Sequence, residues 1–234
     1  MTREQFNEIK ERLAKYREIR HLTYENQQAE FLGNAFEKIS EYFKAKDDLQ
    51  RVKALCGIAI LYLNSFNAEF INITINQNSS KKSYVMGDIV WNIQELMSEI
   101  NNELDFEYIT SEDFKDYEFD LIFKIECVVK DLGFNFYKCM IEAIKEIESK
   151  NIGNYCEYEN KFYQMPGAYT LDEAYKLAFY RESNEPNLNG KTKPKFHKEN
   201  NIMWTFKYKS ALGGDMELNF IKWHKADYES CKLQ

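Results

Sequence analysis

The fold of this chain is decided by the stretch from Phe36 to Ile60, which reads FEKISEYFKAKDDLQRVKALCGIAI. Apolar residues recur every three or four positions on both sides of the polar segment Ala45–Asp48, a spacing typical of two amphipathic helices. Asp47 and Asp48 suit the start of the second helix, because their carboxylates can accept hydrogen bonds from its first backbone N–H groups. Two helices joined by so short a connection are expected to pack antiparallel.

The second of these helices becomes apolar on every side between Ile58 and Leu63. A helix without a polar face is expected at the centre of a bundle or in a contact between subunits. The first helix extends back to about residue 25, and the same periodicity predicts further helices at residues 3–19, 88–103, 118–131 and 135–149. We therefore predict a mainly α-helical protein in which residues 1–150 form a helical core.

The pattern changes after Lys150, and residues 151–234 are predicted to form a small α+β extension. Its expected elements are a hairpin at 152–163, a helix at 170–180, a basic loop at 182–200, strands at 202–208 and 216–221, and a helix at 223–231. Within the core, residues 70–75 alternate like a strand or form a frayed helix end, and an acidic linker covers 103–116.

Composition narrows the class of protein. Only 3 of the 234 residues are Pro, which favours helices over a turn-rich sheet fold. A net charge of -7 argues against general nucleic-acid binding, which needs many cations to neutralise phosphates. No apolar run reaches the roughly 18 residues of a membrane span. The 5 cysteines are scattered without a C-x-x-C pair, so we expect reduced thiols and a cytoplasmic location without membrane contact.

Residues 36–60 resemble the two-helix centre of the MazG-like nucleoside triphosphate pyrophosphohydrolases. Residues 132–149 and 223–231 are similar to segments of phage-type relatives in that family. The resemblance implies a MazG-like all-α bundle that forms a homodimer or a larger assembly. It also implies cleavage of a nucleoside triphosphate or its deoxy form to monophosphate and pyrophosphate, with Mg²⁺, or alternatively Mn²⁺, as the cofactor.

The family holds its metal with acidic residues, since Mg²⁺ prefers oxygen ligands and bridges to substrate phosphates. By the resemblance, Glu37 and Glu41 are metal ligands, and their spacing of four places both on one helix face. Lys38 stands where the family has a second glutamate. Asn64 is implied to hydrogen-bond the edge of a nucleobase, and a cap at the helix end is the alternative.

The second helix departs from the family pattern. Gln50, Lys53 and Gly57 replace acidic residues, and no carboxylate occurs between Asp48 and Glu69. One hypothesis is that the metal site is lost and the protein is a non-catalytic nucleotide-binding or protein-interaction member of the fold. The other is a rebuilt site, in which Glu37 and Glu41 act with acids from elsewhere in the chain, or alternatively Lys53 acts as a catalytic residue that takes over part of the metal's charge-neutralising role. The acids that could complete such a site are Glu95, Glu99, Glu142 and Glu146.

Overall fold

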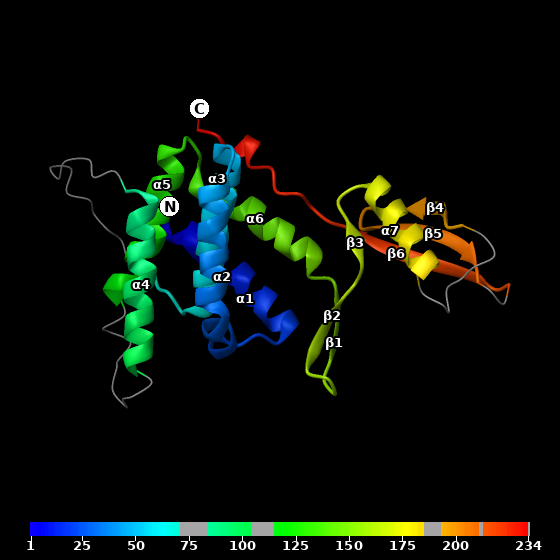
Figure 1. Ribbon diagram of the computed structural model, residues 1–234, viewed down its shortest axis with the longest axis horizontal. Helices are drawn as coiled ribbons and strands as arrows, with labels where there is room; N and C mark the ends of the chain where they lie inside the picture. The colour runs from blue at the N-terminus through cyan, green and yellow to red at the C-terminus, as the bar shows by residue number, and fades with distance from the viewer. Residues whose placement is uncertain (71–83, 104–114, 185–192, 211–212, 234) are drawn as a thin grey trace. The chain divides into compact units, whose positions relative to one another are not determined.

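The computed structural model describes residues 1–70, 84–103, 115–184, 193–210 and 213–233. The chain divides into two compact units (Figure 1). The first unit holds Met1–Ile144 together with Ala226–Gln234, and the second holds Lys145–Lys225. The C-terminal end, assigned to the extension from the sequence, thus packs with the helical unit. The fold is mainly helical with a small sheet region toward the C-terminus, as predicted.

In the described residues, six helices build the first unit, and the last of them continues into the second. They are α1 (Arg3–Arg20), α2 (Tyr24–Lys44), α3 (Asp48–Ser65), α4 (Met86–Glu103), α5 (Lys115–Asp131) and α6 (Phe136–Lys150). Local sequence signals fix where the first three begin. Thr2 and Thr23 each form a capping box, and the Asp47 carboxylate accepts from the Gln50 N–H at 2.8 Å.

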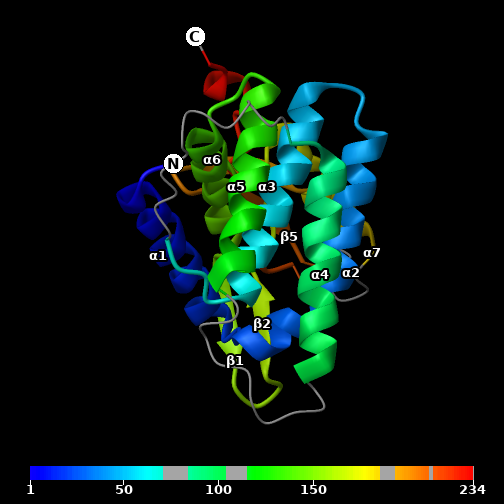
Figure 2. The ribbon, with the colours of Figure 1, turned by 90° about the vertical axis from the view of Figure 1, so that its left-hand side faces the viewer.

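α3 is the central helix of the first unit and contacts α1, α2 and α5 (Figure 2). Its residues from Ile58 to Leu63 are buried, apart from the half-buried Leu61. The apolar residues on every side of α3 are therefore explained by burial inside its own chain. Of the two placements expected for this helix, the centre of a bundle is confirmed, and its apolar surface gives no basis for a subunit contact.

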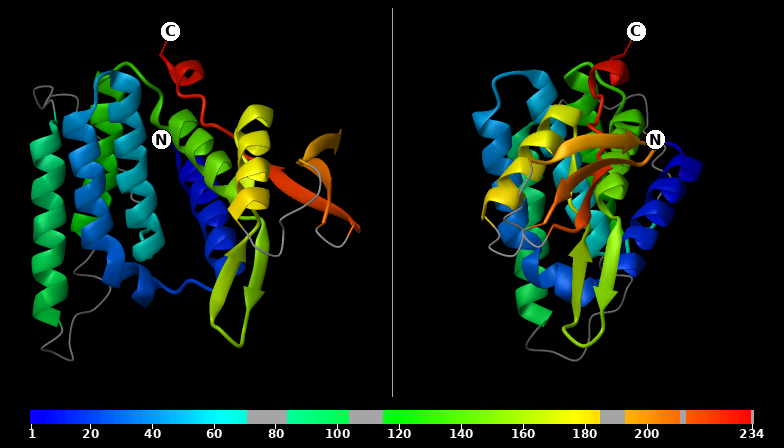
Figure 3. Two further views of the ribbon diagram at one scale, coloured as in Figure 1. Left: turned by 45° about the vertical axis from the view of Figure 1, so that its right-hand side comes forward. Right: turned by 90° about the vertical axis from the view of Figure 1, so that its right-hand side faces the viewer.

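The described part of the second unit contains a hairpin, a four-stranded sheet and one helix (Figure 3). The strands are β1 (Gly153–Cys156), β2 (Lys161–Gln164), β3 (Gly167–Ala168), β4 (Lys195–Glu199), β5 (Met203–Lys209) and β6 (Asp215–Lys222). β1 pairs with β2, and the sheet order is β3-β6-β5-β4 with only the β3–β6 pair parallel. Helix α7 (Leu171–Asn184) covers one sheet face by packing Ala174 and Ala178 on Trp204, Phe206 and Phe220.

Two segments differ from the sequence prediction. β4 lies inside the predicted loop 182–200, where its exposed residues form the edge of the sheet. The predicted helix at 223–231 is reduced to a 3₁₀ turn, Glu229–Cys231, because the chain stays extended beyond β6 and Trp223 N–H donates to the Ala168 carbonyl at 2.8 Å. The predictions for 70–75 and 103–116 fall largely on 71–83 and 104–114, outside the described residues. Among the described helices, none has the length and apolar character needed to cross a bilayer.

Candidate functional site

The helices that resemble the family's catalytic centre form a packed hairpin. α2 and α3 are joined by the three residues Ala45–Asp47 and lie against each other along their length (Figure 2). The periodicity of residues 36–60 predicted this arrangement correctly. The face of this hairpin that carries Glu41 on α2 and Gly57 on α3 is the candidate site.

Lys38 crosses this face and lies on Gly57. A Cβ added at Gly57 would stand 2.9 Å from Cδ of Lys38 and 3.4 Å from its Cγ and Cε. The missing side chain at position 57 therefore makes room for the aliphatic part of the lysine. At its far end, the Lys38 ammonium donates to Glu41 Oε1 at 2.7 Å.

The two predicted metal ligands are not joined by a third acidic group. Glu37 is exposed on α2, and Glu41 is engaged by Lys38. The described part of the chain contains no group of three or more His, Cys, Asp or Glu side chains that could hold a metal ion. The residues present do not fit a magnesium site, because α3 has no carboxylate beyond Asp48 in its first turn, which pairs with Arg51, and the Lys38 ammonium pairs with Glu41.

The acids that could have rebuilt the site have other roles or lie elsewhere. Glu142 accepts from the backbone N–H of Asp227 at 3.1 Å. Glu146 accepts from Lys150 at 2.7 Å and belongs to the second unit. Glu95 is half-buried on α4, and the side chain of Glu99 lies outside what the structure describes.

Lys53 lies on the same face of α3 as Gly57, one helical turn before it, and is exposed. The hairpin face thus presents two lysines, of which Lys38 pairs with Glu41 and Lys53 is exposed. Lysine is a compact point charge that binds phosphate groups well. The two ammonium groups can bind an anion, and the face lacks the clustered carboxylates that a divalent cation needs.

Asn64 has a structural partner. Its side chain is 4% exposed, and its Oδ1 accepts from Arg17 Nη1 at 3.0 Å. The same guanidinium donates to the Leu63 carbonyl and lies over the ring of Tyr24, 4.6 Å from its centroid. Asn64 therefore ties the end of α3 to α1, which sequence reasoning could not find because Arg17 is distant in the chain.

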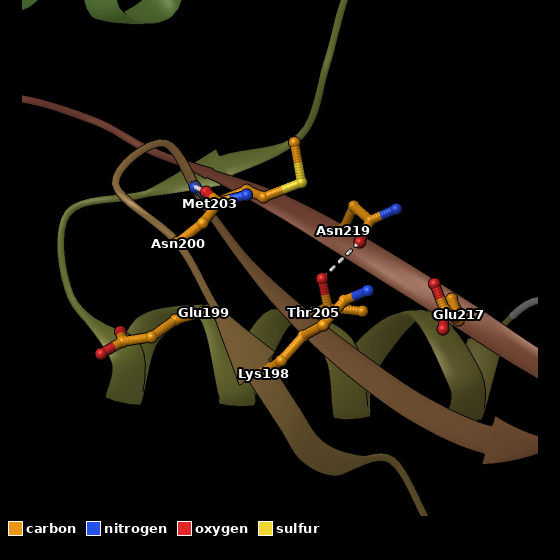
Figure 4. Close-up of a pocket in the computed structure, with 7 residues that line it drawn as sticks. All are labelled: Lys198, Glu199, Asn200, Met203, Thr205, Glu217 and Asn219. Atoms are coloured by element: carbon orange, nitrogen blue, oxygen red, sulfur yellow. Dashed lines mark hydrogen bonds between the residues drawn. The ribbon is translucent and has the colours of Figure 1, made fainter.

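A polar cavity of about 280 Å³ on the second unit had no sequence prediction (Figure 4). It is lined by Lys198, Glu199, Asn200, Met203, Thr205, Glu217 and Asn219. Thr205 is 2% exposed, and its hydroxyl donates to Asn219 Oδ1 at 2.8 Å. The alternation of side chains along β5 could have indicated this cavity. Trp204 and Phe206 face α7, so Thr205 between them points to the opposite face of the sheet.

A second cluster in the same unit joins α6 to the sheet segment. Tyr169 donates to Glu146 Oε1 at 2.6 Å, and its ring lies edge-on to Trp223. Lys150 lies 5.0 Å from the Tyr169 ring centroid and pairs with the same carboxylate. Burial disfavours the charged form of Lys150, but its bonds to Glu146 and Tyr169 outweigh this and raise its pKa. Burial and the bond to Glu146 raise the pKa of Tyr169.

Three buried cysteines meet in the first unit. The thiol of Cys139 on α6 is hydrogen-bonded with those of Cys56 on α3 and Cys231 in the C-terminal segment. The bond with Cys56 and burial raise the pKa of Cys139. Burial raises the pKa of Cys231 to about 12. A raised pKa keeps the thiols of Cys139 and Cys231 protonated and unreactive, so these two buried side chains serve packing.

Comparison with known protein families, with curated proteins and with solved structures found no match. The likeness to the MazG-like family therefore rests on the residues of this chain alone.

Proposed function

We propose that this chain is a nucleotide-binding protein on a MazG-like helical scaffold, in which lysines take the place of the metal and hydrolysis is lost. The observation that carries the proposal is Lys38, which lies on Gly57 and pairs with Glu41 at 2.7 Å. An ammonium group held at this point of the hairpin excludes a divalent cation by charge repulsion and by volume.

The phosphates of a nucleotide would be bound by Lys38 and Lys53. Lys38 exchanges its exposed partner Glu41 for a phosphate oxygen, which costs little because an exposed ion pair contributes about 0–1 kcal/mol. Neither lysine can generate a hydroxide from water as a bound metal ion does, so cleavage of the triphosphate is not supported. Nucleotide binding without turnover follows from this donor set.

The proposal includes a homodimer as the working state and a single nucleotide as the ligand. A net charge of -7 opposes binding to long nucleic acids, whose affinity depends on neutralising many phosphates. One nucleotide requires only the local charge of the hairpin face. The cytoplasm, where nucleotides are abundant, is the proposed location.

A second candidate is the Mg²⁺- or Mn²⁺-dependent pyrophosphohydrolase itself. It is favoured by the packed hairpin over residues 36–60, which carries Glu37 and Glu41 on one helix as the family pattern requires. Further carboxylates would have to join these two in the working state. The two candidates differ in whether nucleotide binding needs a divalent metal.

The deciding experiment combines thermal unfolding with a pyrophosphate assay on a panel of ribo- and deoxynucleoside triphosphates. With EDTA present and ligand at ten times its Kd, binding is expected to raise the Tm by about 3–5 °C. Lys38→Glu and Lys53→Glu should abolish that shift. Lys15→Glu, the same charge change at an exposed site on α1, should leave it intact.

Each outcome decides between the candidates. Metal-dependent pyrophosphate release that Glu41→Ala abolishes would establish the hydrolase and overturn the metal-free binder. The absence of both a thermal shift and turnover across the panel would overturn both.

A gain-of-function variant tests the role of Lys38 directly. The double change Lys38→Glu with Gly57→Asp replaces the ammonium with acids on both helices. We expect it to bind Mn²⁺ in calorimetry where the native chain does not, because carboxylates from both helices then face one another. Equal Mn²⁺ binding by the native chain would show that Lys38 does not exclude a metal.

A further inference from the structure

One face of α2 carries a stripe of small and aromatic residues that the rest of the described chain leaves open. Its members are Ala29, Gly33, Phe36, Ser40 and Phe43, spaced alternately by four and three residues. Phe36 is 45% exposed and Phe43 is 68% exposed. A Cβ added at Gly33 would have nothing within 4 Å, so the surface around it is open.

Within the described residues, α2 contacts both α3 and α4, and the stripe does not include its buried residues. Phe31, Ala35 and Ile39 point into the core, and Lys38 lies toward α3. A spacing of four and three is the repeat by which two helices pack along each other. A helix face that only contacts solvent would not need apolar residues at this repeat.

We infer that this stripe is the surface by which α2 pairs, antiparallel, with α2 of a second copy of the chain. The order of side-chain sizes fits that pairing. Phe36 lies at the midpoint of the stripe and would meet its own copy on the two-fold axis. On either side, Ser40 would face Gly33 of the second copy, and Phe43 would face Ala29, so that large side chains meet small ones.

Charge agrees with the same register. Glu30 and Lys44 flank opposite ends of the stripe on one side of it, and neither forms an ion pair within the described residues. Antiparallel pairing places Glu30 beside Lys44 of the second copy, and does so twice by symmetry. Glu37 would face its own copy near the axis, a single like-charge contact against two attractive ones.

The size of the contact predicts a modest affinity. At about 200 Å² for a Phe side chain, Phe36 and Phe43 expose roughly 230 Å² per chain. Both copies together then supply more than a third of the about 1,200 Å² of a small stable interface. The flanking residues along the roughly 21 Å from Ala29 to Phe43 supply the remainder. A reversible, concentration-dependent dimer follows.

This inference rests on the homodimer of the proposed function, and sedimentation equilibrium of the full chain tests it. Gly33→Arg is the principal variant, because arginine is a better helix former than glycine and meets open space in one copy, yet blocks the pair. We expect the dissociation constant of the dimer to rise at least about tenfold, while the stability of the monomer is unchanged or higher. Ile19→Ala, at an apolar residue of α1 that is 47% exposed, should leave dimerisation unchanged.

A charge exchange tests the register. Glu30→Lys should weaken the dimer about three- to tenfold, and adding Lys44→Glu should restore it. A monomer at every concentration overturns this inference and the homodimer but leaves nucleotide binding standing. A dimer that tolerates Gly33→Arg and Phe43→Ala overturns the α2 surface and leaves the homodimer. Failure of the charge exchange to restore the dimer overturns the antiparallel register.

Discussion

Replacing Gly57 with alanine tests how Lys38 lies on α3. The added Cβ would stand 2.9 Å from Lys38 Cδ, so the lysine must move. Its side chain is flexible, and only the 2.7 Å pair with Glu41 is at risk. That pair is 31% and 49% exposed at its two ends, and such a pair contributes about 0.3–0.5 kcal/mol. Alanine in place of glycine inside a helix gains about 1 kcal/mol. We expect a net gain of about 0.5 kcal/mol.

The measurement is a double-mutant cycle by urea denaturation. With Lys38→Ala in the background there is no lysine to displace, so Gly57→Ala should gain the full value of about 1 kcal/mol. Gly33→Ala is the matched control, because its Cβ meets open space, and in dilute protein it should gain about 1 kcal/mol in either background. The reasoning is refuted if Gly57→Ala behaves like Gly33→Ala in both backgrounds, since Lys38 would then not lie on Gly57.

The remaining predictions concern contacts away from the hairpin face. Asn64→Ala should lower the free energy of unfolding by about 1.5–3 kcal/mol in urea denaturation, because it removes the acceptor of the Arg17 guanidinium at a buried site; an unchanged midpoint would contradict this. Tyr169→Phe keeps the ring but removes the donor to Glu146, so the second unit should lose about 1 kcal/mol, as followed by near-ultraviolet circular dichroism. Cys231 has its pKa raised from 9.0 to about 12, so the folded state holds a proton that the unfolded state releases. Stability should therefore be full below pH 9 and fall from there toward pH 12, and a Cys231→Ala variant should show a smaller fall.

The helical hairpin could be predicted because its signals are local. The periodicity of residues 36–60 and the capping side chain of Asp47 act within a few residues, and they place α2 and α3 to within a residue or two. The strands β5 and β6 were found for the same reason, from alternation and the glycines between them. Elements of this kind are decided by neighbours in the sequence.

The segments that were missed depend on distant partners. β4 has no buried residue of its own and exists because β5 offers an edge for pairing. The stretch after Lys222 was predicted as a helix, but Trp223 is held in an extended segment beside Gly167, where a Cβ would lie 2.2 Å from the indole Nε1. Only a glycine at position 167 lets the Trp223 indole come this close. The fold rather than the local sequence brings Gly167 and Trp223 together.

The candidate site was predictable in part. Helical spacing predicts that Glu37 and Glu41 share one face of α2, and the sequence shows no acid on α3 after Asp48. It could not place the Lys38 side chain, because that depends on the point where α2 crosses Gly57 of α3. Asn64 was interpreted as a ligand for a nucleobase or a cap, and its bond to Arg17 requires the packing of α1 against α3.

The charge on the hairpin face links these details to function. Glu37 and Glu41 are offset by Lys38 and Lys53, so the face carries two carboxylates and two ammonium groups and no net charge. Without the lysines the two carboxylates would repel a triphosphate unless a divalent cation lay between them. In the proposed binding protein, the lysines repel a metal and allow a nucleotide to bind without one. Under the proposed function, we expect Lys38 to control metal dependence, since changing it to glutamate would take the charge of these four side chains from neutral to about -2, which favours a metal-bridged nucleotide.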